Sequence, residues 1–148
     1  MYKISFKNLI FAAILAIIVM ILFALPETYI NISADNYSPK TGDIINIDVD
    51  VIKKSNFGTT TVEILLPNGT TYLNTVYGKE PKNNTVFNEK YNISETYLKW
   101  TFNNEDKFGS SINILILNSE NKTIKATSKT EFLIYDSLNS DKLIISAD

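Results

Sequence analysis

The first 25 residues differ from the rest of the chain in their pattern of hydrophobic positions. Residues 9–25 form an unbroken apolar run without a charged or polar side chain. About 17 residues at about 1.5 Å each give a helix of about 26 Å, near the lower limit for crossing a hydrocarbon core. The run therefore predicts a transmembrane helix over residues 9–25, preceded by a stub of residues 1–8.

The charges that flank this run predict its orientation. Lys3 and Lys7 precede it, and the first charged residues after it are acidic, Glu27 and Asp35. By the positive-inside rule, the stub is cytoplasmic and everything after the helix is extracytoplasmic. The alternative is a cleaved signal peptide, because Ala24 offers one small residue near the end of the run. The run is longer than the apolar core of a typical signal peptide, which favours an uncleaved anchor.

After residue 25 the hydrophobic pattern has a period of two. Short stretches alternate apolar with polar residues and are separated by turn-forming Pro, Gly, Asn and Asp. The stretches predicted as strands are 29–33, 44–51, 60–66, 70–77, 97–102, 112–116 and 123–135, and 78–84 is the most loop-like segment. Such strands, without a helical period between them, predict an all-β domain over residues 26–135. We expect an antiparallel immunoglobulin-like β-sandwich.

Residues 136–148 remain beyond the predicted sandwich. This tail contains a short apolar patch formed by Leu143, Ile144 and Ile145. Two interpretations are open. The tail adds an edge strand to the sheet of its own domain, or it pairs with the sheet or groove of a partner protein. In the second case the three apolar residues are candidate partner-binding residues.

The composition argues against most catalytic and metal-binding chemistry. The chain has no cysteine and no histidine, so it lacks disulfides, the usual zinc and copper ligands, and Ser-His or Cys-His catalysis. We therefore expect no enzyme activity, no cofactor and no bound metal, and a small-molecule ligand is not expected either. The net charge of -2 with scattered lysines gives no basic stripe, which argues against a nucleic-acid partner.

Alternation also assigns directions to a few charged residues. Asp48 and Asp50 share the polar face of the strand at 44–51, and with Asp43 they are the best candidates for calcium ligands. Calcium needs several converging oxygens, and no acidic loop of the required spacing is present. The pattern therefore favours solvated carboxylates. In the strand at 97–102, Lys99 is predicted to point outward and Trp100 into the core.

The order of turns and strands carries a family resemblance. A proline–glycine turn leads into the alternating strand of SADNYSPKTGDIINIDVDV, and the turn in VEILLPNGTTYLN precedes an aromatic-containing strand. YLKWTFNN supplies a tryptophan strand, and GSSINILIL opens with a glycine–serine turn. In this order the chain resembles the DUF11 family of immunoglobulin-like surface domains over residues 33–135. The resemblance implies a non-catalytic surface domain, and its single copy suggests an accessory subunit instead of a repetitive stalk.

The segment after the helix contains six Asn-x-Ser/Thr sequons, the acceptor sequence for N-glycosylation. Asn36 is the weakest, because Pro39 directly follows its sequon. The candidate glycosylation sites are Asn31, Asn68, Asn83, Asn92 and Asn121. Several lie in or beside predicted turns, where a transferase reaches them most easily. Glycans at these positions would fit an extracytoplasmic surface.

These features predict a single-pass protein of the cell membrane, with a cytoplasmic N-terminus and an extracytoplasmic C-terminal domain. We expect an accessory or adhesion-type module of an archaeal cell-envelope complex, in contact with another envelope or membrane protein. Ala12, Ala13 and Ala16 give the helix a small-residue face for packing against other membrane subunits. Three alternatives stay open: a pilin-like filament subunit, an archaellum stator-like component, and a secreted binding domain released by cleavage near Ala24.

Overall fold

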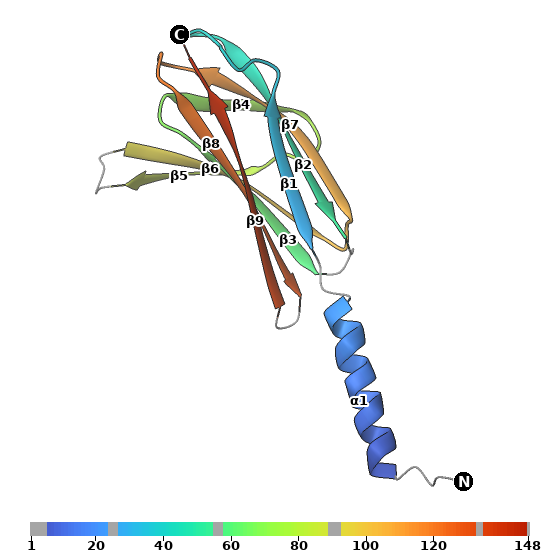
Figure 1. The fold of residues 1–148 in the computed structure, drawn as a ribbon. Coiled ribbons are helices and arrows are strands. Elements are labelled where there is room, and N and C mark those ends of the chain that lie inside the picture. The colour runs from blue at the N-terminus through green and yellow to red at the C-terminus, as the bar shows by residue number, and fades with distance from the viewer. Residues whose placement is uncertain (1–5, 24–26, 55–57, 89–92, 133–134, 148) are drawn as a thin grey trace.

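A computed structural model describes residues 6–23, 27–54, 58–88, 93–132 and 135–147 of the 148-residue chain. Within this part, one N-terminal helix is followed by nine strands (Figure 1). The elements are α1 Phe6–Phe23, β1 Thr28–Ala34, β2 Ile44–Lys53, β3 Thr59–Leu66, β4 Thr70–Tyr77, β5 Lys82–Asn88, β6 Ile93–Asn103, β7 Lys107–Ile116, β8 Lys122–Phe132 and β9 Tyr135–Ile145.

The strands form two antiparallel sheets that pack face to face (Figure 1). The strand order is β1-β2-β7-β4 in the four-stranded sheet and β5-β6-β3-β8-β9 in the five-stranded sheet. The chain changes sheet after β2, β3, β4, β6 and β7, so each sheet combines consecutive strands, such as β1 and β2, with strands that are distant in sequence. The predicted all-β architecture with antiparallel sheets is therefore confirmed.

The core between the sheets is built by alternation along the strands. In β2 the residues from Ile45 to Val51 at odd positions are buried, while Asp48 and Asp50 between them are exposed. β-branched side chains dominate these inward positions, as expected for residues that fit a pleated surface. The same alternation in β7 buries every second residue. Each sheet therefore has one apolar inner face and one polar outer face.

Trp100 of β6 lies in the middle of this core and is 1% exposed. Its indole N–H donates a hydrogen bond to the backbone carbonyl of Lys79 at 2.6 Å. Its ring lies 5.8 Å from the ring of Phe108 of β7, in the opposite sheet. The buried indole thus keeps a hydrogen-bond partner while it joins the two sheets, and the predicted inward direction of Trp100 is correct.

The sandwich is closed along one side and open along the other. On the closed side β1 lies against β8 and β9, where the hydroxyl groups of Thr28 and Thr130 are 2.6 Å apart. The backbone N–H of Ile32 also donates to the carboxylate of Asp141 at 3.1 Å. On the open side, β4 and β5 are the edge strands of their sheets in the described part of the chain. Figure 1 shows the β5–β6 hairpin projecting from this side.

The structure adds one strand where the sequence predicts a loop. β5 begins within the loop-like stretch 78–84 and pairs with β6 along its whole length. Its side chains from Lys82 to Phe87 are all exposed. Without a buried face, the segment carries no alternating pattern, so backbone pairing with β6 forms the strand and hydrophobic periodicity could not reveal it.

The tail beyond Asp136 belongs to the sandwich. β9 pairs with β8 from Tyr135 to Ile145 and forms the edge of the five-stranded sheet. The structure therefore supports the first interpretation of the tail, in which it adds an edge strand to the sheet of its own domain. The single long strand expected at 123–135 is instead a β8–β9 hairpin, and the sandwich extends ten residues past the predicted boundary at residue 135.

Helix α1 lies outside the sandwich (Figure 1). Its described side chains, from Phe6 to Met20, are exposed, and none of them belongs to the hydrophobic core. In the part of the chain that the structure describes, no helix has both the length and the apolar character needed to span a membrane. Residues 1–5 of the predicted stub and residues 24–25 of the predicted helix lie outside the described part.

Candidate interaction surface

The outer face of the five-stranded sheet is rich in lysine. Alternation places these lysines outward, because their neighbours along the strands, such as Leu98, Trp100 and Leu143, point into the core. We call the outward side chains around them the basic face. Its five exposed lysines are Lys82, Lys99, Lys125, Lys129 and Lys142.

Two pairs of these lysines oppose each other on neighbouring strands. Lys82 of β5 is the register partner of Lys99 of β6, and Lys125 of β8 is the partner of Lys142 of β9. Like charges in directly opposed positions destabilise a sheet. Among the described residues, none of these four lysines forms a salt bridge. The basic face also carries four carboxylates, those of Glu63, Glu95, Glu131 and Asp136, so charges of both signs lie on it.

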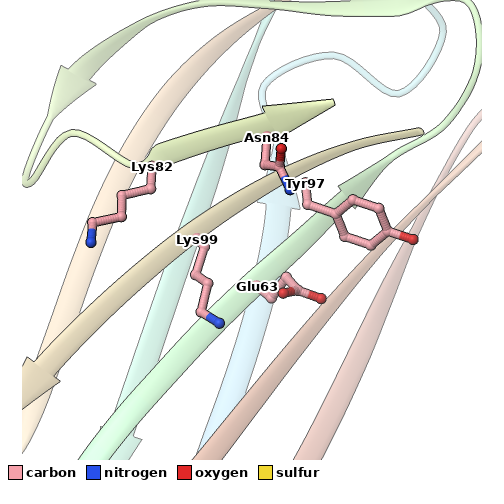
Figure 2. A pocket seen from close by; sticks show the side chains of 5 residues that line it. All are labelled: Glu63, Lys82, Asn84, Tyr97 and Lys99. Atoms are coloured by element: carbon pink, nitrogen blue, oxygen red, sulfur yellow. The ribbon is translucent and has the colours of Figure 1, made fainter. Parts of the chain in front are cut away.

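The first pair borders a shallow depression of about 420 Å³ (Figure 2). Glu63, Asn84 and Tyr97 complete its lining. Figure 2 shows the Lys99 side chain extending toward the carboxylate of Glu63 on the neighbouring strand β3, while the Lys82 side chain extends away from it. Glu63 is the register partner of Lys99. One carboxylate at the centre of the face therefore stands among several ammonium groups.

The second pair borders another open depression, of about 600 Å³, over β8 and β9. Its lining residues are Lys125, Thr127, Leu138, Ser140, Asp141 and Lys142. Leu138 also lines a smaller hollow of about 370 Å³ that reaches back to Glu63 and Lys99. The depressions are thus contiguous across the sheet and form one broad, shallow surface instead of an enclosed pocket.

Lys129 differs from the other lysines because it is paired within the sheet. Its ammonium nitrogen lies 2.6 Å from the Glu131 carboxylate and 3.2 Å from that of Asp136, and these hydrogen bonds raise the pKa of Lys129. Tyr97 donates its hydroxyl proton to Glu95 at 3.0 Å, which raises the pKa of that tyrosine. At neutral pH Lys129 is therefore charged and Tyr97 neutral.

The outer face of the four-stranded sheet carries two aspartates and one lysine, Asp48, Asp50 and Lys107. Asp48 and Asp50 point outward from β2, and their register partners on β1 and β7 are uncharged. Among the described residues, neither aspartate forms a salt bridge. Lys107 of β7, opposite Ile52, lies one row from Asp50. We call the outward side chains around Asp48 and Asp50 the acidic face.

A hydrogen-bond chain orders the polar side chains beside these aspartates. Ser111 of β7 donates its hydroxyl proton to the side-chain carbonyl of Asn46 at 2.6 Å. The side-chain N–H of Asn46 in turn donates to the side-chain carbonyl of Asn113 at 3.2 Å. Ser111 is the register partner of Asp48. The acidic face is therefore a polar surface with ordered side chains beside Asp48 and Asp50, which form no salt bridge with the described residues.

The chemistry of both faces suits binding better than catalysis. Within the described residues, no group of three or more His, Cys, Asp or Glu side chains could hold a metal ion. The carboxylate of Asp43, the third calcium candidate, accepts a hydrogen bond from the backbone N–H of Lys40 at 2.8 Å. What the faces offer is charge, hydroxyl and amide groups, and exposed apolar side chains such as Leu138 and Ile52.

The sequon asparagines lie apart on the surface. Asn31 is on β1 beside Asp50, Asn68 is in the β3–β4 turn, Asn83 is on β5, and Asn121 precedes β8. All four are exposed, so the structure leaves them accessible. The fifth candidate, Asn92, lies outside the described residues.

The apolar candidates divide into buried and exposed groups. Leu143 and Ile145 of β9 are 4% and 0% exposed, so they belong to the core of this chain and are not available to a partner. Their assignment as partner-binding residues is wrong, because strand alternation turns both inward. Only Ile144 between them is exposed, at 56%. The three alanines of the proposed helix-packing face, Ala12, Ala13 and Ala16, are exposed on α1.

Sequence reasoning did not find the paired lysines. Alternation alone predicts that Lys99 points outward, but it cannot say which residue stands opposite. The partner of Lys99 is set by the pairing of β5 with β6, and β5 lacked a sequence signal. The pair formed by Lys125 and Lys142 likewise depends on the β8–β9 hairpin, whose turn was placed inside a single strand.

Comparisons of the sequence with protein families and with curated proteins found no match. Solved structures are similar in fold. The CARDB domain of a Pyrococcus furiosus protein, crystallised in complex with di-metal ions, has 16% identity and a TM-score of 0.54 over 84% of this chain and 96% of that domain. The major pilin SpaD of Corynebacterium diphtheriae has 10% identity and a TM-score of 0.50 over 80% of this chain and 35% of the pilin.

At these identities the likeness establishes the fold alone. This chain is similar to one complete CARDB domain but to only about a third of SpaD. The metal ions belong to the CARDB crystal, and the assembly of a pilus to SpaD. Two antiparallel sheets and these neighbours together show that the chain folds as an immunoglobulin-like β-sandwich.

Proposed function

We propose that this chain is a non-catalytic interaction module of the cell envelope, anchored in the membrane by α1. The exposed helix is the observation that carries the proposal. Its large apolar side chains, from Phe6 to Met20, are 41–75% exposed and occur on every side of the helix. A helix that is apolar all round is normally buried in a protein core or a membrane. The sandwich provides no such cover, so we assign the membrane.

The sequence supports the length and orientation of this anchor. The uncharged run continues to residue 25, beyond the last described side chain of α1. Leaving one large aliphatic side chain in water instead of burying it costs about 1.5–3 kcal/mol, so an uncovered helix of this composition is strongly disfavoured. Lys3 and Lys7 before the run favour a cytoplasmic N-terminus under the positive-inside rule. The sandwich then lies on the extracytoplasmic side.

The partner in this proposal is another protein of an archaeal cell envelope. The resemblance to DUF11 surface domains and the two charged faces support an interaction role for the sandwich. Ala12, Ala13 and Ala16 would let α1 pack closely against another membrane helix. We also propose glycosylation at the exposed sequons Asn31, Asn68, Asn83 and Asn121, and at Asn92, which suits an extracytoplasmic surface.

A pair of matched variants of the full chain tests the anchor. Leu15→Lys with Ile18→Lys places two charges in the middle of the run, and each costs about 2.5–3.5 kcal/mol at the centre of a membrane helix. Leu15→Ala with Ile18→Ala shortens the same side chains without adding charge. After alkaline carbonate washing of membranes, we expect the wild type and the alanine variant in the pellet and the lysine variant in the supernatant. A wild type that washes off contradicts the proposal.

Mass spectrometry of protein from native membranes separates the alternatives. An intact N-terminus and stoichiometric co-purifying membrane proteins support an anchored accessory subunit. A mature N-terminus near Leu25 without partners indicates a secreted binding domain. Long homopolymers with a processed N-terminus indicate a pilin-like subunit, and co-purifying archaellum components indicate the stator-like role. Glycopeptide masses from the same sample report which sequons are occupied.

A further inference from the structure

The chain joins the sandwich almost directly after the uncharged run, which ends at Leu25. The backbone carbonyl of Glu27 accepts a hydrogen bond from the backbone N–H of Lys54 at 2.8 Å. The carboxylate of Glu27 forms a salt bridge with the ammonium group of Lys54 and accepts a hydrogen bond from the Tyr29 hydroxyl at 2.8 Å. Glu27 is therefore already fixed to the end of β2, and one residue separates it from the run.

This short connection limits how far the sandwich can stand from a membrane that holds α1. A fully extended chain spans at most about 3.6 Å per residue, so Glu27 lies within about 7 Å of Leu25 and Tyr29 within about 14 Å. The polar layer on each side of a hydrocarbon core is about 5–8 Å thick. In the anchored arrangement proposed above, on which this inference rests, the first residues of β1 therefore lie in this interfacial layer or directly above it.

A row of three side chains crosses the outer face of the four-stranded sheet at this end. Tyr29 of β1 is the register partner of Ile52 of β2, and Ile52 is the partner of Lys107 of β7. Tyr29 and Ile52 are 50% and 53% exposed, and Lys107 is exposed as well. The Lys54 ammonium nitrogen lies 5.8 Å from the centre of the Tyr29 ring. We call Tyr29, Ile52 and Lys107 the proximal row.

The outer face becomes acidic in the next rows. One row further from α1, Asp50 stands between Asn31 and Gly109, and Asp48 lies in the row after that. Each of these steps is two residues, or about 7 Å along the strand. Aromatic and cationic side chains are favoured at the interface between a bilayer and water, whereas carboxylates are best solvated in the water beyond it. The order of the rows therefore matches the polarity profile of a membrane surface.

We propose that the proximal row lies in the interfacial layer of the bilayer that holds α1. Tyr29 suits this layer because its ring is apolar and its hydroxyl group is polar. The stem of Lys107 can cover apolar surface while its ammonium group stays in water. Figure 1 shows β1 leading away from the end of α1. Contact of the row with the bilayer would therefore hold the sandwich upright, with its far end directed toward partners in the envelope.

The charges at this end of the sandwich favour an apolar contact over an electrostatic one. Glu105 and Asp106 directly precede Lys107 and are exposed. The charge of Lys54 is already paired with that of Glu27. Positive charge at this end is thus balanced by carboxylates, so the row has no preference for anionic lipid. We expect the contact in a bilayer of phosphatidylcholine alone, and we expect it to persist in about 1 M salt, which screens exposed charges.

A fluorescent label at single positions tests the inference, because the chain has no cysteine of its own. Ile52→Cys places the label in the proximal row. Ile44→Cys is the control, since Ile44 is on the same face of β2, is 58% exposed and lies eight residues away, about 27 Å along the strand. The labelled full chain is incorporated into phosphatidylcholine vesicles that contain a lipid with a nitroxide quencher on its headgroup. The quencher occupies both leaflets, so the orientation of the chain in the vesicle does not affect the result.

We expect the label at Ile52→Cys to be quenched at least threefold more strongly than the label at Ile44→Cys. A label at Asn31→Cys, one row above the proximal row, should give an intermediate value. Adding Tyr29→Asp to the Ile52→Cys chain should lower the quenching at least twofold, because a carboxylate is disfavoured in the interfacial layer. Tyr37→Asp is the matched variant, since Tyr37 is also 50% exposed but lies outside the row, and it should leave the quenching unchanged. Circular dichroism confirms that each variant is folded.

Flotation of the same vesicles separates the possible failures. A chain that does not float with the vesicles overturns the proposed anchor and this inference with it. A chain that floats, but whose labels at Ile52→Cys and Ile44→Cys are quenched equally, keeps the anchor and overturns this inference alone. Equal effects of Tyr29→Asp and Tyr37→Asp would also overturn it. Quenching at Ile52→Cys that requires anionic lipid or disappears in about 1 M salt would assign the contact to charge instead of to the interfacial layer.

Discussion

At the scale of single residues, Lys53 at the end of β2 is unexpected, because a lysine there is only 4% exposed. Its ammonium nitrogen lies 3.3 Å from the backbone carbonyl of Gly58 and 5.9 Å from the centre of the Phe102 ring. Burial lowers the pKa of Lys53, and the nearby carboxylate of Glu105 opposes this only in part. A buried lysine of this kind is satisfied locally but carries a cost for its charge.

This cost makes the stability depend on pH. Because the pKa of Lys53 is lower in the folded state, the unfolded chain binds more protons between the folded pKa and the unfolded value of about 10.4. The contribution of Lys53 to the free energy of unfolding therefore rises as the pH increases through this window. We expect Lys53→Met to abolish this rise. Urea unfolding of both proteins from neutral to alkaline pH measures the difference between them.

A matched variant makes the comparison specific. Lys40→Met removes an exposed lysine from a turn and should keep the pH profile of the wild type. If Lys53→Met also follows the wild-type profile at alkaline pH, then Lys53 does not have a lowered pKa in the folded protein. The expected sign is fixed by the direction of the shift, because a raised pKa would make the stability fall as the pH rises through the same window.

At the scale of elements, the alternation of apolar and polar residues predicts a strand where that strand has one buried face. β2 and β7 bury every second residue. β2 was predicted over most of its length, but β7 only over 112–116, because Gly109 and Ser110 were wrongly predicted to form a turn and instead pair with β2. β5 has no buried face, so its pairing with β6 left no trace in the sequence. The same limit applies to the candidate surface. The outward direction of a side chain can be predicted from its own strand. Which residues oppose each other, such as Lys82 and Lys99, depends on the register between two strands.

β9 shows how register and alternation divide one apolar patch. Leu143 and Ile145 point into the core, whereas Ile144 between them points to solvent. We therefore expect Leu143→Ala and Ile145→Ala each to lower the free energy of unfolding by about 2–5 kcal/mol, because each leaves a cavity. Ile144→Ala should change it by no more than about 0.5 kcal/mol. Chemical unfolding followed by the fluorescence of Trp100 measures all three.

The pattern among these three variants separates the two roles of the tail. A tail that docked on a partner without packing on its own domain would leave the unfolding free energy almost unchanged in all of them. Equal losses at all three positions would contradict the alternation of β9, because a solvent-facing isoleucine leaves no cavity when it is shortened. Only a large loss at Leu143 and Ile145 with a small one at Ile144 agrees with the edge strand.

At the scale of the whole molecule, the helix and the sandwich are stabilised by different surroundings. The first residue of the described core is Ile30, and no described residue of α1 contributes to it. The closed side of the sandwich is formed by β1 against β8 and β9, and all three strands begin after residue 27. The sandwich therefore contains its own core, while the apolar surface of α1 requires cover from outside the domain.

Deletion of residues 1–26 tests this separation. We expect the remaining chain to fold without detergent and to unfold in one cooperative transition, because all strands, the core and the contact between Thr28 and Thr130 are retained. Its midpoint in urea should equal that of the full chain in non-ionic detergent, since α1 gives the core no contact to lose. A truncated chain that lacks a cooperative transition would show that the sandwich depends on the helix. A midpoint that falls with the deletion would show the same dependence, and anchoring and folding could then not be assigned to separate parts of the chain.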